Sequence, residues 1–263
     1  MEQRTLRVLI ACHKPCARPD DPCYLPVAVG AALRAEPIPG CVPDNTGDNI
    51  SAKNRNYCEL TALYWAWKNL EADYIGLVHY RRYFSGGKLW QAKRIRILSE
   101  DGFRRALEKC DILLPRPRNY WIETNYSQYA HAHHAVDLDT TREILRERHP
   151  DYVAVFDASM KRTVGHRFNM FVMSREKLDA YCAWLFDILF TLEARLDISG
   201  YSAYDARVFG FVAERLLDVW LETNGYAYRE LPYVFTEKQN WLKKGGAFLM
   251  RKIGVNVRRK KYG

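Results

Sequence analysis

The sequence predicts an α/β protein, in which the strands of a central sheet alternate with helices along the chain. Short apolar runs at 6–12 and 74–78 have the length and composition of buried strands. Apolar residues recur at helical spacing in two later segments, 176–190 and 208–223. This alternation predicts a sheet covered by helices, with ligands bound at the carboxyl ends of its strands.

The composition indicates a folded domain with anionic partners. The chain has 263 residues, of which 48% are hydrophobic and 13% aromatic, so it can bury a sizeable core. Lys and Arg number 40 against 31 Asp and Glu, for a formal net charge of +9. This balance favours nucleotide phosphates, nucleic acid or an acidic membrane surface as partners. No apolar run approaches the roughly 20 residues that span a bilayer.

The seven cysteines are scattered, and no secretory signal precedes them. We therefore expect reduced thiols in a cytosolic protein. Cys12, Cys16 and Cys23 are close in sequence, but no second matching pair follows and prolines interrupt the spacing. Zinc binding is therefore not favoured there.

In the first part of the chain, the strand at 6–12 ends at His13-Lys14-Pro15 and a proline-rich loop follows to residue 43. A helix is predicted from a cap at Asn49 or Ser51 to residue 68, because residues 60, 63, 64 and 67 are apolar. Lys53 and Asn54 lie in its first turn, where the helix dipole attracts anions. An ordinary solvated surface is the alternative interpretation of this turn.

The strand at 74–78 is the centre of the prediction, because it runs directly into His79-Tyr80-Arg81-Arg82. Gly76 within it leaves room for close packing of a neighbour. Two adjacent guanidinium groups at a strand's carboxyl end suit a phosphate or diphosphate, since each can donate two N–H bonds. An edge strand running into a solvated basic loop is the alternative. The three aromatic residues among positions 80–84 favour a binding site.

The rest of the chain contains further predicted helices and strands, with less regular sequence patterns. Segment 88–98 alternates basic and apolar residues and reads as a strand or a basic amphipathic helix. The other predicted elements are a helix capped by Ser99, a strand at 111–115, an irregular region at 119–166 with one charged helix at 139–148, a strand at 167–173, a helix capped by Ser174, a helix at 208–223 ended by Gly225, and strand pieces at 226–235.

The irregular region carries two groups of candidate binding residues. The first group is aromatic and could pack on the faces of sugar rings; it comprises Tyr120, Trp121, Tyr126 and Tyr129. The second group comprises His131, His133, His134 and Asp137, which resembles a metal-binding set. A further acidic ligand at a defined spacing is missing, so hydrogen bonds to an acceptor or ordinary helix packing are favoured over a metal.

The chain divides into a domain at 1–237 and a basic C-terminal tail at 238–263. The tail holds nine Lys and Arg residues after position 237, interleaved with apolar residues and without Asp or Glu. This pattern is typical of an amphipathic segment on an anionic membrane, where each charge contributes roughly 1 kcal/mol. A solubilising tail is the alternative interpretation.

Several of these segments together resemble a bacterial family of glycosyltransferases of capsule, exopolysaccharide and O-antigen synthesis, long catalogued as a domain of unknown function. The resemblance covers about residues 6 to 220. The matching segments are His13-Lys14-Pro15, Asp48-Asn49-Ile50-Ser51-x-Lys53-Asn54-x-x-Tyr57-x-Glu59-Leu60-Thr61-Ala62-Leu63-Tyr64-Trp65, Tyr74-Ile-Gly-Leu-x-His79-Tyr80-Arg81-Arg82-Tyr83-Phe84, Asn169-Met170-Phe171, Tyr181-x-x-Trp184-Leu185-Phe186 and Arg207-Val-Phe-Gly210-Phe-x-x-Glu214-Arg215-Leu216.

The resemblance implies a single GT-A-like nucleotide-binding domain with a mixed, mostly parallel central sheet flanked by helices. It implies transfer of a sugar from a nucleotide-diphosphate donor, UDP-linked and galactose-type, to a lipid-linked or growing surface polysaccharide. It also implies a cytoplasmic enzyme, peripheral on the inner face of the cytoplasmic membrane, with no nucleic-acid partner. The residues expected at the donor are His13, Lys14, Ser51, Lys53, Asn54, Tyr57, His79, Tyr80, Arg81, Arg82 and Arg207, and those expected at the acceptor are His131, His133, His134 and Asn169.

The sequence differs from the GT-A pattern at the position of the metal site. GT-A enzymes carry an Asp-x-Asp that holds a divalent metal on the donor diphosphate, and here His79-Tyr80-Arg81-Arg82 takes that place. Asp73, the only acid nearby, lies at the other end of the strand. We therefore expect arginine charge, rather than Mn²⁺ or Mg²⁺, to neutralise the leaving diphosphate.

An inverting transfer to a hydroxyl also needs a carboxylate base. The resemblance favours Asp205, near the start of a late helix, with Glu214 and Asp137 as alternatives. Two other classes of function stay open on the sequence alone. One is a basic nucleic-acid-binding protein, which predicts salt-dependent affinity, and the other is a metal hydrolase built on the cluster at 131–137.

Overall fold

The computed structural model describes residues 4–86 and 97–237. Its centre is a mixed, mostly parallel sheet with the strand order β10-β6-β9-β4-β1-β2-β3. These strands are β1 (Leu6–Cys12), β2 (Tyr24–Ala28), β3 (Val42–Pro43), β4 (Tyr74–His79), β6 (Ile112–Pro115), β9 (Phe171–Ser174) and β10 (Arg229–Leu231). The α/β prediction is confirmed. Most of segment 88–98 and the whole predicted tail at 238–263 lie outside the described residues.

The register of the parallel strands decides where the site lies. Strands β1, β2 and β3 run parallel to one another, and β4 runs parallel to β1 with Ala11 opposite His79. The carboxyl ends of β1 and β4 are therefore flush at one edge of the sheet. Strand β9 is antiparallel to both its neighbours, β4 and β6, so it enters the sheet from that same edge.

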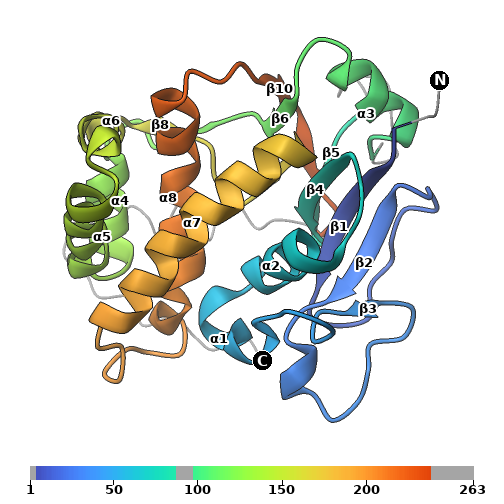
Figure 1. Ribbon diagram of the computed structural model, residues 1–263, viewed down its shortest axis with the longest axis horizontal. Helices are drawn as coiled ribbons and strands as arrows, with labels where there is room; N and C mark the ends of the chain where they lie inside the picture. Colours follow the sequence, from blue (N-terminus) through green and yellow to red (C-terminus); the bar gives the residue numbers. More distant parts are fainter. Residues whose placement is uncertain (1–3, 87–96, 238–263) are drawn as a thin grey trace.

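Helices cover the sheet because its strands alternate apolar side chains to both faces. Leu9 and Ala11 pack into one core with α2 (Leu60–Asn69), α7 (Arg175–Arg195) and α8 (Val208–Thr223). Val8 and Ile10 pack into a second core with α3 (Glu100–Leu107). Figure 1 shows α7 lying obliquely between the sheet and a lobe of three further helices, α4 (Asn125–Ala132), α5 (Ala135–Arg148) and α6 (Val153–Lys161).

Two short strand pairs extend this framework. Strand β5 (Arg82–Phe84) comes after β4 and a tight turn, and it pairs antiparallel with β11 (Tyr233–Phe235). Strands β7 (Arg118–Asn119) and β8 (Val164–Gly165) form a separate antiparallel pair. The β5–β11 pair continues from the end of β4 and supplies Arg82 and Phe235 to the candidate site.

Several local predictions are confirmed. Ser99 accepts a hydrogen bond from Gly102 N at the start of α3, and Ser174 accepts one from Lys177 N at the start of α7. Gly225, at φ +62°, lies just after the end of α8. An ideal Cβ on Gly76 would lie 2.7 Å from Val172 Cγ2, so this glycine does allow β9 to pack closely.

Other local predictions are wrong. The proline-rich loop contains β2 and β3. Pro43 lies in the edge strand β3, and Pro26 of β2 precedes the two residues that pair with β3, so both prolines occupy positions that a sheet tolerates. The region at 119–166 is largely helical, since α4, α5 and α6 occupy it. The predicted strand at 167–173 shortens to β9, because Phe168 and Asn169 adopt positive φ angles of 86° and 48°.

The predicted helix from Ser51 to residue 68 is interrupted. It consists of a 3₁₀ turn (Ser51–Lys53), the short helix α1 (Asn54–Tyr57) and then α2. The break falls at Cys58, which has φ 54° and ψ −129°. This conformation is costly for a residue with a side chain, so tertiary contacts must hold it.

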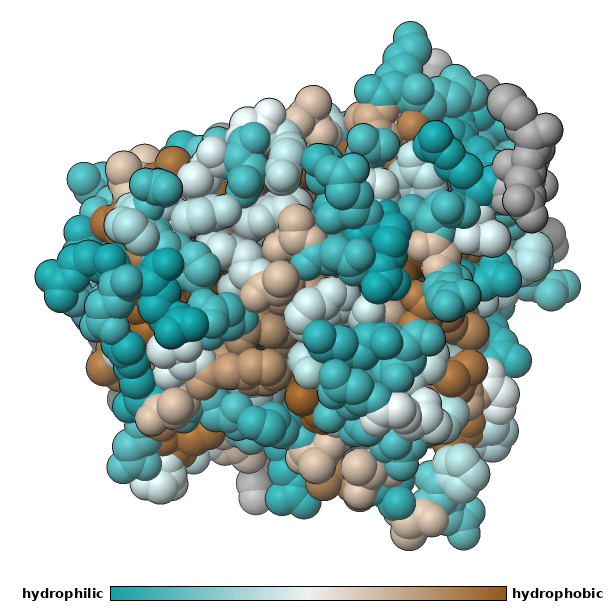
Figure 2. Space-filling view, viewed as in Figure 1, coloured by the Kyte–Doolittle hydropathy of each residue, from teal (hydrophilic) through white to brown (hydrophobic). Residues whose placement is uncertain are grey.

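The surface in the orientation of Figure 1 is mostly hydrophilic, with smaller apolar patches between polar groups, as Figure 2 shows. Among the described residues, none of the helices combines the length and hydropathy that a bilayer crossing requires. All seven cysteines are described and carry free thiols.

Candidate active site

The carboxyl ends of β1 and β4 bring two predicted donor residues together. The rings of His13 and His79 are 5.7 Å apart, and the Tyr80 ring lies 4.4 Å from that of His79. Lys14 Nζ lies 5.7 Å from the centre of the Tyr80 ring, and Arg81 Cζ lies 4.8 Å from it. The structure therefore brings these five predicted donor residues together at one edge of the sheet.

Arg82 is held beneath this edge by aromatic rings. Its Cζ lies 3.4 Å from the centre of the Phe168 ring and 5.2 Å from that of Phe235. Its Nε is buried and has no hydrogen-bond partner among the described residues. Burial lowers the pKa of Arg82 to about 10, so the side chain is still a cation at neutral pH. A desolvated cation with an unused N–H is well suited to an anionic ligand.

Arg207 also lies near the ends of β1 and β4. It belongs to the 3₁₀ turn Asp205–Arg207, which directly precedes α8. Its Nε donates a hydrogen bond to Cys58 Sγ over 3.0 Å. Burial lowers the pKa of Arg207, but contact with Cys58 and the charge of Glu59 outweigh this effect, and the net shift is upward. Arg207 therefore adds a permanent positive charge.

The pKa values of His13 and His79 are lowered by burial and by the positive charges of these arginines. Burial lowers the pKa of His13 to about 4, and the charges of Arg207, Arg34 and Arg81 add to the effect. Burial also lowers the pKa of His79 to about 2, with contributions from His13 and Arg82. Both imidazoles are therefore neutral at pH 7, in a positive potential that attracts anions.

Arg81 is the most exposed member of the cluster. It forms an ion pair of 3.5 Å with Glu237, and each side chain is nearly half exposed. Such a pair contributes little to stability, so it leaves Arg81 available to an anion. We call Arg81, Arg82 and Arg207, with His13 and His79, the arginine–histidine cluster.

Two carboxylates lie behind the cluster. Glu59 Oε1 accepts a hydrogen bond of 2.9 Å from Asn169 Nδ2, which also donates to Gly210 O. Burial raises the pKa of Glu59, and the Asn169 bond only partly offsets this. The negative charges of Glu214 and Glu59 both stabilise the Arg82 cation. Glu214 is itself bonded to Arg215 at 3.0 Å.

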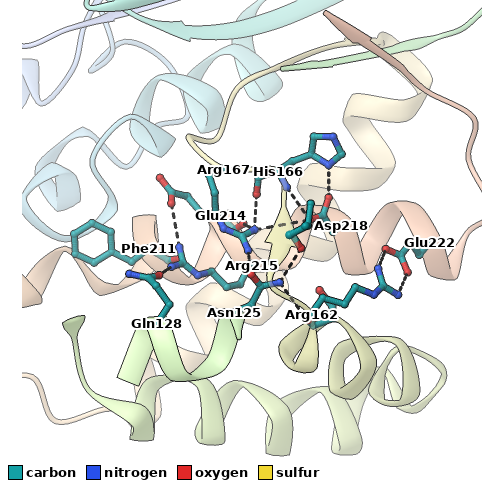
Figure 3. A network of polar contacts seen from close by, with 12 residues as sticks. Asn125, Gln128, Arg162, His166, Arg167, Phe211, Glu214, Arg215, Asp218 and Glu222 are labelled. Atoms are coloured by element: carbon teal, nitrogen blue, oxygen red, sulfur yellow. Dashed lines mark hydrogen bonds and ion pairs between the residues drawn. The ribbon is translucent and has the colours of Figure 1, made fainter. Parts of the chain in front are cut away.

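A buried polar network holds the loop that carries Phe168 and Asn169. His166 N donates to Asp218 Oδ2 at 2.9 Å, and Arg167 Nη1 donates to the carbonyl oxygens of His166 and Glu214. Figure 3 shows that Arg167 of this loop reaches Glu214 on α8 and Asn125 on α4, while Arg215 of α8 donates to Gln128 of α4. The loop is thereby anchored to two helices at once.

The structure places four predicted donor residues away from the cluster's cations. Ser51 donates to the buried Asp44, and Asn54 donates to Cys58 O and Thr61 Oγ1, so both hold the backbone at the edge of the sheet. Lys53 and Tyr57 both bond to Glu193 of α7. The positive charge of Lys53 is thus engaged in an ion pair within the fold.

The predicted acceptor residues and carboxylates are spread over α4, α5, the loop before β9, the turn at 201–207 and α8. His131 bonds to Glu123, and the ring of His134 stacks on that of Tyr201 at 4.0 Å. His133 Nδ1 lies 3.2 Å from Asp205 Oδ1, so one predicted acceptor residue and one predicted base do meet. Asp137 is fully buried and accepts hydrogen bonds from Tyr129 and Tyr201. That setting is typical of a structural carboxylate.

The donor set does not fit a divalent metal. The end of β4 presents His79, Arg81 and Arg82, and cationic guanidinium groups repel a metal ion. Across residues 4–86 and 97–237, no three His, Cys, Asp or Glu side chains gather to hold a metal.

Sequence reasoning missed several residues of this site. Phe168, Arg34, Cys58 and Asp44 carry no local signal, because their roles depend on long-range contacts. Glu59 lies within the longest of the motifs that carry the resemblance, and this was the one available signal for it.

The protein is an α/β domain whose cationic site lies at the carboxyl ends of parallel strands, the position at which such sheets bind ligands. Its sequence matches the model of a domain of unknown function, DUF4422, over residues 7–225. The chain belongs to this family.

One solved structure with a similar fold is described as "WbbM bifunctional glycosytransferase apo structure". It is 32% identical, with a TM-score of 0.81 over 89% of this chain. The chain spans less than half, 46%, of the length of that protein. No curated protein matches the sequence.

Proposed function

We propose that this protein is a glycosyltransferase that binds a nucleotide-diphosphate sugar at the arginine–histidine cluster. The observation that carries the proposal is the convergence of Arg81, Arg82 and Arg207 on the carboxyl ends of β1 and β4. A diphosphate is the common nucleotide group that three guanidiniums match in charge and in donor geometry. The similarity to a bifunctional glycosyltransferase supports sugar transfer as the reaction.

In this proposal the cluster stabilises the departing diphosphate. As the bond between the sugar's anomeric carbon and the phosphate oxygen breaks, negative charge develops on that oxygen. Fixed guanidinium groups stabilise this charge without having to reorganise. Because Arg82 is clamped between Phe168 and Phe235, its position is set before the donor binds.

Two carboxylates predicted from the sequence stand near the cluster and are proposed to contact the acceptor. Asp205 is held by Ser202 and His133, two residues before Arg207. Burial raises the pKa of Asp205, but these hydrogen bonds outweigh it and the net shift is downward, so the carboxylate is ionised. Glu214 lies on α8 beside Arg215. Either group can orient an acceptor hydroxyl.

The finer assignments remain proposals as well. We propose a UDP-linked, galactose-type donor and a lipid-linked or growing surface-polysaccharide acceptor, which the resemblance supports. We also propose a cytoplasmic enzyme at the inner face of the membrane. The support for membrane attachment is the basic sequence at 238–263.

A thermal-shift screen of nucleoside diphosphates tests the donor site. The experiment compares wild type with an Arg81→Ala/Arg82→Ala variant, each with and without EDTA, and uses Arg142→Ala as a control. Arg142 pairs with Asp157 on the surface of the helical lobe, far from β4 in the fold. A bound nucleotide raises the melting temperature by mass action.

Stabilisation by UDP that survives EDTA, persists in the control and disappears in the double variant is the expected result. Stabilisation that EDTA abolishes would return a metal to the mechanism. Absence of any nucleotide response in wild type would contradict the proposed function.

A further inference from the structure

The backbone around Glu59 is strained from several sides. Four non-glycine residues among those described have positive φ angles, and three of them lie next to Glu59 in the chain or in the loop that contacts it: Cys58 at 54°, Phe168 at 86° and Asn169 at 48°. Cys58 directly precedes Glu59, and Asn169 donates the hydrogen bond to its Oε1. Such conformations cost of order 1–3 kcal/mol each and concentrate at functional sites.

Two of the strained residues also hold members of the cluster. The thiol of Cys58 accepts a hydrogen bond from Arg207, and the Phe168 ring lies against Arg82. Relaxing either residue to a common conformation would move a cation of the cluster and Glu59 together. The strain therefore fixes one carboxylate relative to two guanidiniums.

The environment of Glu59 is that of a proton acceptor. The residue is partly exposed, and among the described residues no side chain donates a hydrogen bond to Oε2. Burial raises its pKa, which brings its basicity closer to that required at neutral pH. Asp205 is less basic, because its hydrogen bonds from Ser202 and His133 lower its pKa.

From this geometry we infer that Glu59 is the catalytic base of the transfer, while Asp205 positions the acceptor. This inference rests on the proposed function. The acceptor hydroxyl gives its proton to Glu59 as its oxygen forms a bond to the anomeric carbon. The bond from that carbon to the diphosphate oxygen breaks, and the nucleoside diphosphate leaves with the electron pair beside Arg82 and Arg207.

The test compares Glu59→Gln with wild type and with the control Glu147→Gln. Glutamine keeps the shape of the side chain and can still accept the Asn169 hydrogen bond through its amide oxygen. Glu147 pairs with Arg195 on the surface of α5, so it has no part in the site. The readouts are release of nucleoside diphosphate from UDP-hexoses with a glycan acceptor, the dissociation constant of UDP, and the melting temperature.

We expect Glu59→Gln to lower kcat by about 10²–10⁴-fold, as for loss of a general base. The KM of this variant for the donor and its affinity for UDP should stay within about threefold of wild type, because the proton is transferred only in the transition state and does not contribute to donor binding. The acid limb of the pH–rate profile, which lies above the usual range for a glutamate in wild type, should disappear. Asn169→Asp should move this limb to higher pH, because a second acidic group then faces Glu59.

The outcomes separate the inference from the proposed function. If wild type neither binds UDP nor turns over any sugar nucleotide, the proposed function fails. If wild type is active and Glu59→Gln keeps its kcat, the inference alone is overturned. If Glu59→Gln neither folds nor binds UDP, the same measurements are made on Glu59→Asp, which keeps the negative charge. For that variant an unchanged kcat and an unshifted acid limb would equally overturn the inference.

Discussion

The guanidinium carbon of Arg82 lies 3.4 Å from the centre of the Phe168 ring. Arg82 begins β5, directly after the turn that follows β4, and Phe168 lies in the loop before β9, so the two residues meet at one edge of the sheet. The contact places a desolvated cation next to the strained backbone that also holds Glu59. Because both connections are anchored by buried contacts, the geometry of the site is determined by the fold before a ligand arrives.

The Arg82–Phe168 contact predicts that lysine cannot replace this arginine. Arg82→Lys keeps the charge but loses the planar group that stacks on the ring and the fork that a phosphate requires. We expect the affinity for UDP to fall about 10-fold, which corresponds to about 1.4 kcal/mol. Isothermal titration calorimetry measures this, with Arg104→Lys as the control, since Arg104 pairs with Glu100 inside α3. Equal affinities in the two variants would contradict the role of Arg82.

The buried Asp44 predicts a large effect on stability. Its carboxylate accepts hydrogen bonds from Gly30 N, Ala31 N, Ser51 Oγ and Thr61 Oγ1. In Asp44→Asn the amide group can no longer accept two of these bonds, so we expect a loss of about 2–4 kcal/mol. Urea denaturation tests this against Asp197→Asn, an exposed aspartate that caps only Ser199 N. A loss below about 1 kcal/mol, the net value of a single ordinary hydrogen bond, would show that Asp44 does not tie these loops together.

The close approach of β4 and β9 predicts a steric cost at Gly76. A Cβ there would lie 2.7 Å from Val172 Cγ2 and 3.0 Å from Phe171 O, and the backbone oxygen cannot move aside cheaply. We expect Gly76→Ala to destabilise the protein by about 1–3 kcal/mol and to lower its melting temperature by several degrees. Gly200→Ala is the matched control, because no atom lies within 4 Å of its Cβ. Similar melting temperatures for the two variants would be the contrary result.

The lowered pKa of His13 predicts a stability that depends on pH. In the absence of nucleotide, the folded protein binds fewer protons at this site than the unfolded chain between pH 6.5 and about 4. Stability contributed by the neutral imidazole is therefore present above pH 6.5 and is lost as the pH falls through this window. Between about pH 7 and pH 5 the loss is on the order of 1–2 kcal/mol.

We expect His13→Gln to show a smaller loss of stability on acidification than wild type, measured by urea denaturation at about pH 7, 6 and 5. His131→Gln is the control, because the side chain of His131 is 66% exposed and lies outside the cluster. If His13→Gln and wild type lose stability in parallel, the positive field at the site does not govern the titration of His13.

The sequence predicts those features of the structure that depend on residues close together in the chain. Local composition and spacing encode the strands β1 and β4, the caps of α3 and α7, and the close packing of β9 against Gly76. The arginine pair at the end of β4 could also be predicted, because the residues directly after a parallel strand emerge at the ligand-binding edge of the sheet.

Tertiary structure decided how these pieces combine into a site. No local pattern reveals that Lys53 turns to Glu193, or that the helix breaks at Cys58. The contacts of Glu59 with Asn169, and of Arg82 with Phe168, join residues that lie far apart in the chain. Positive φ angles at non-glycine residues are unfavourable locally, so only the surrounding packing can impose them. Local sequence therefore specified the strands and their cationic edge, while long-range packing determined which carboxylate faces that edge.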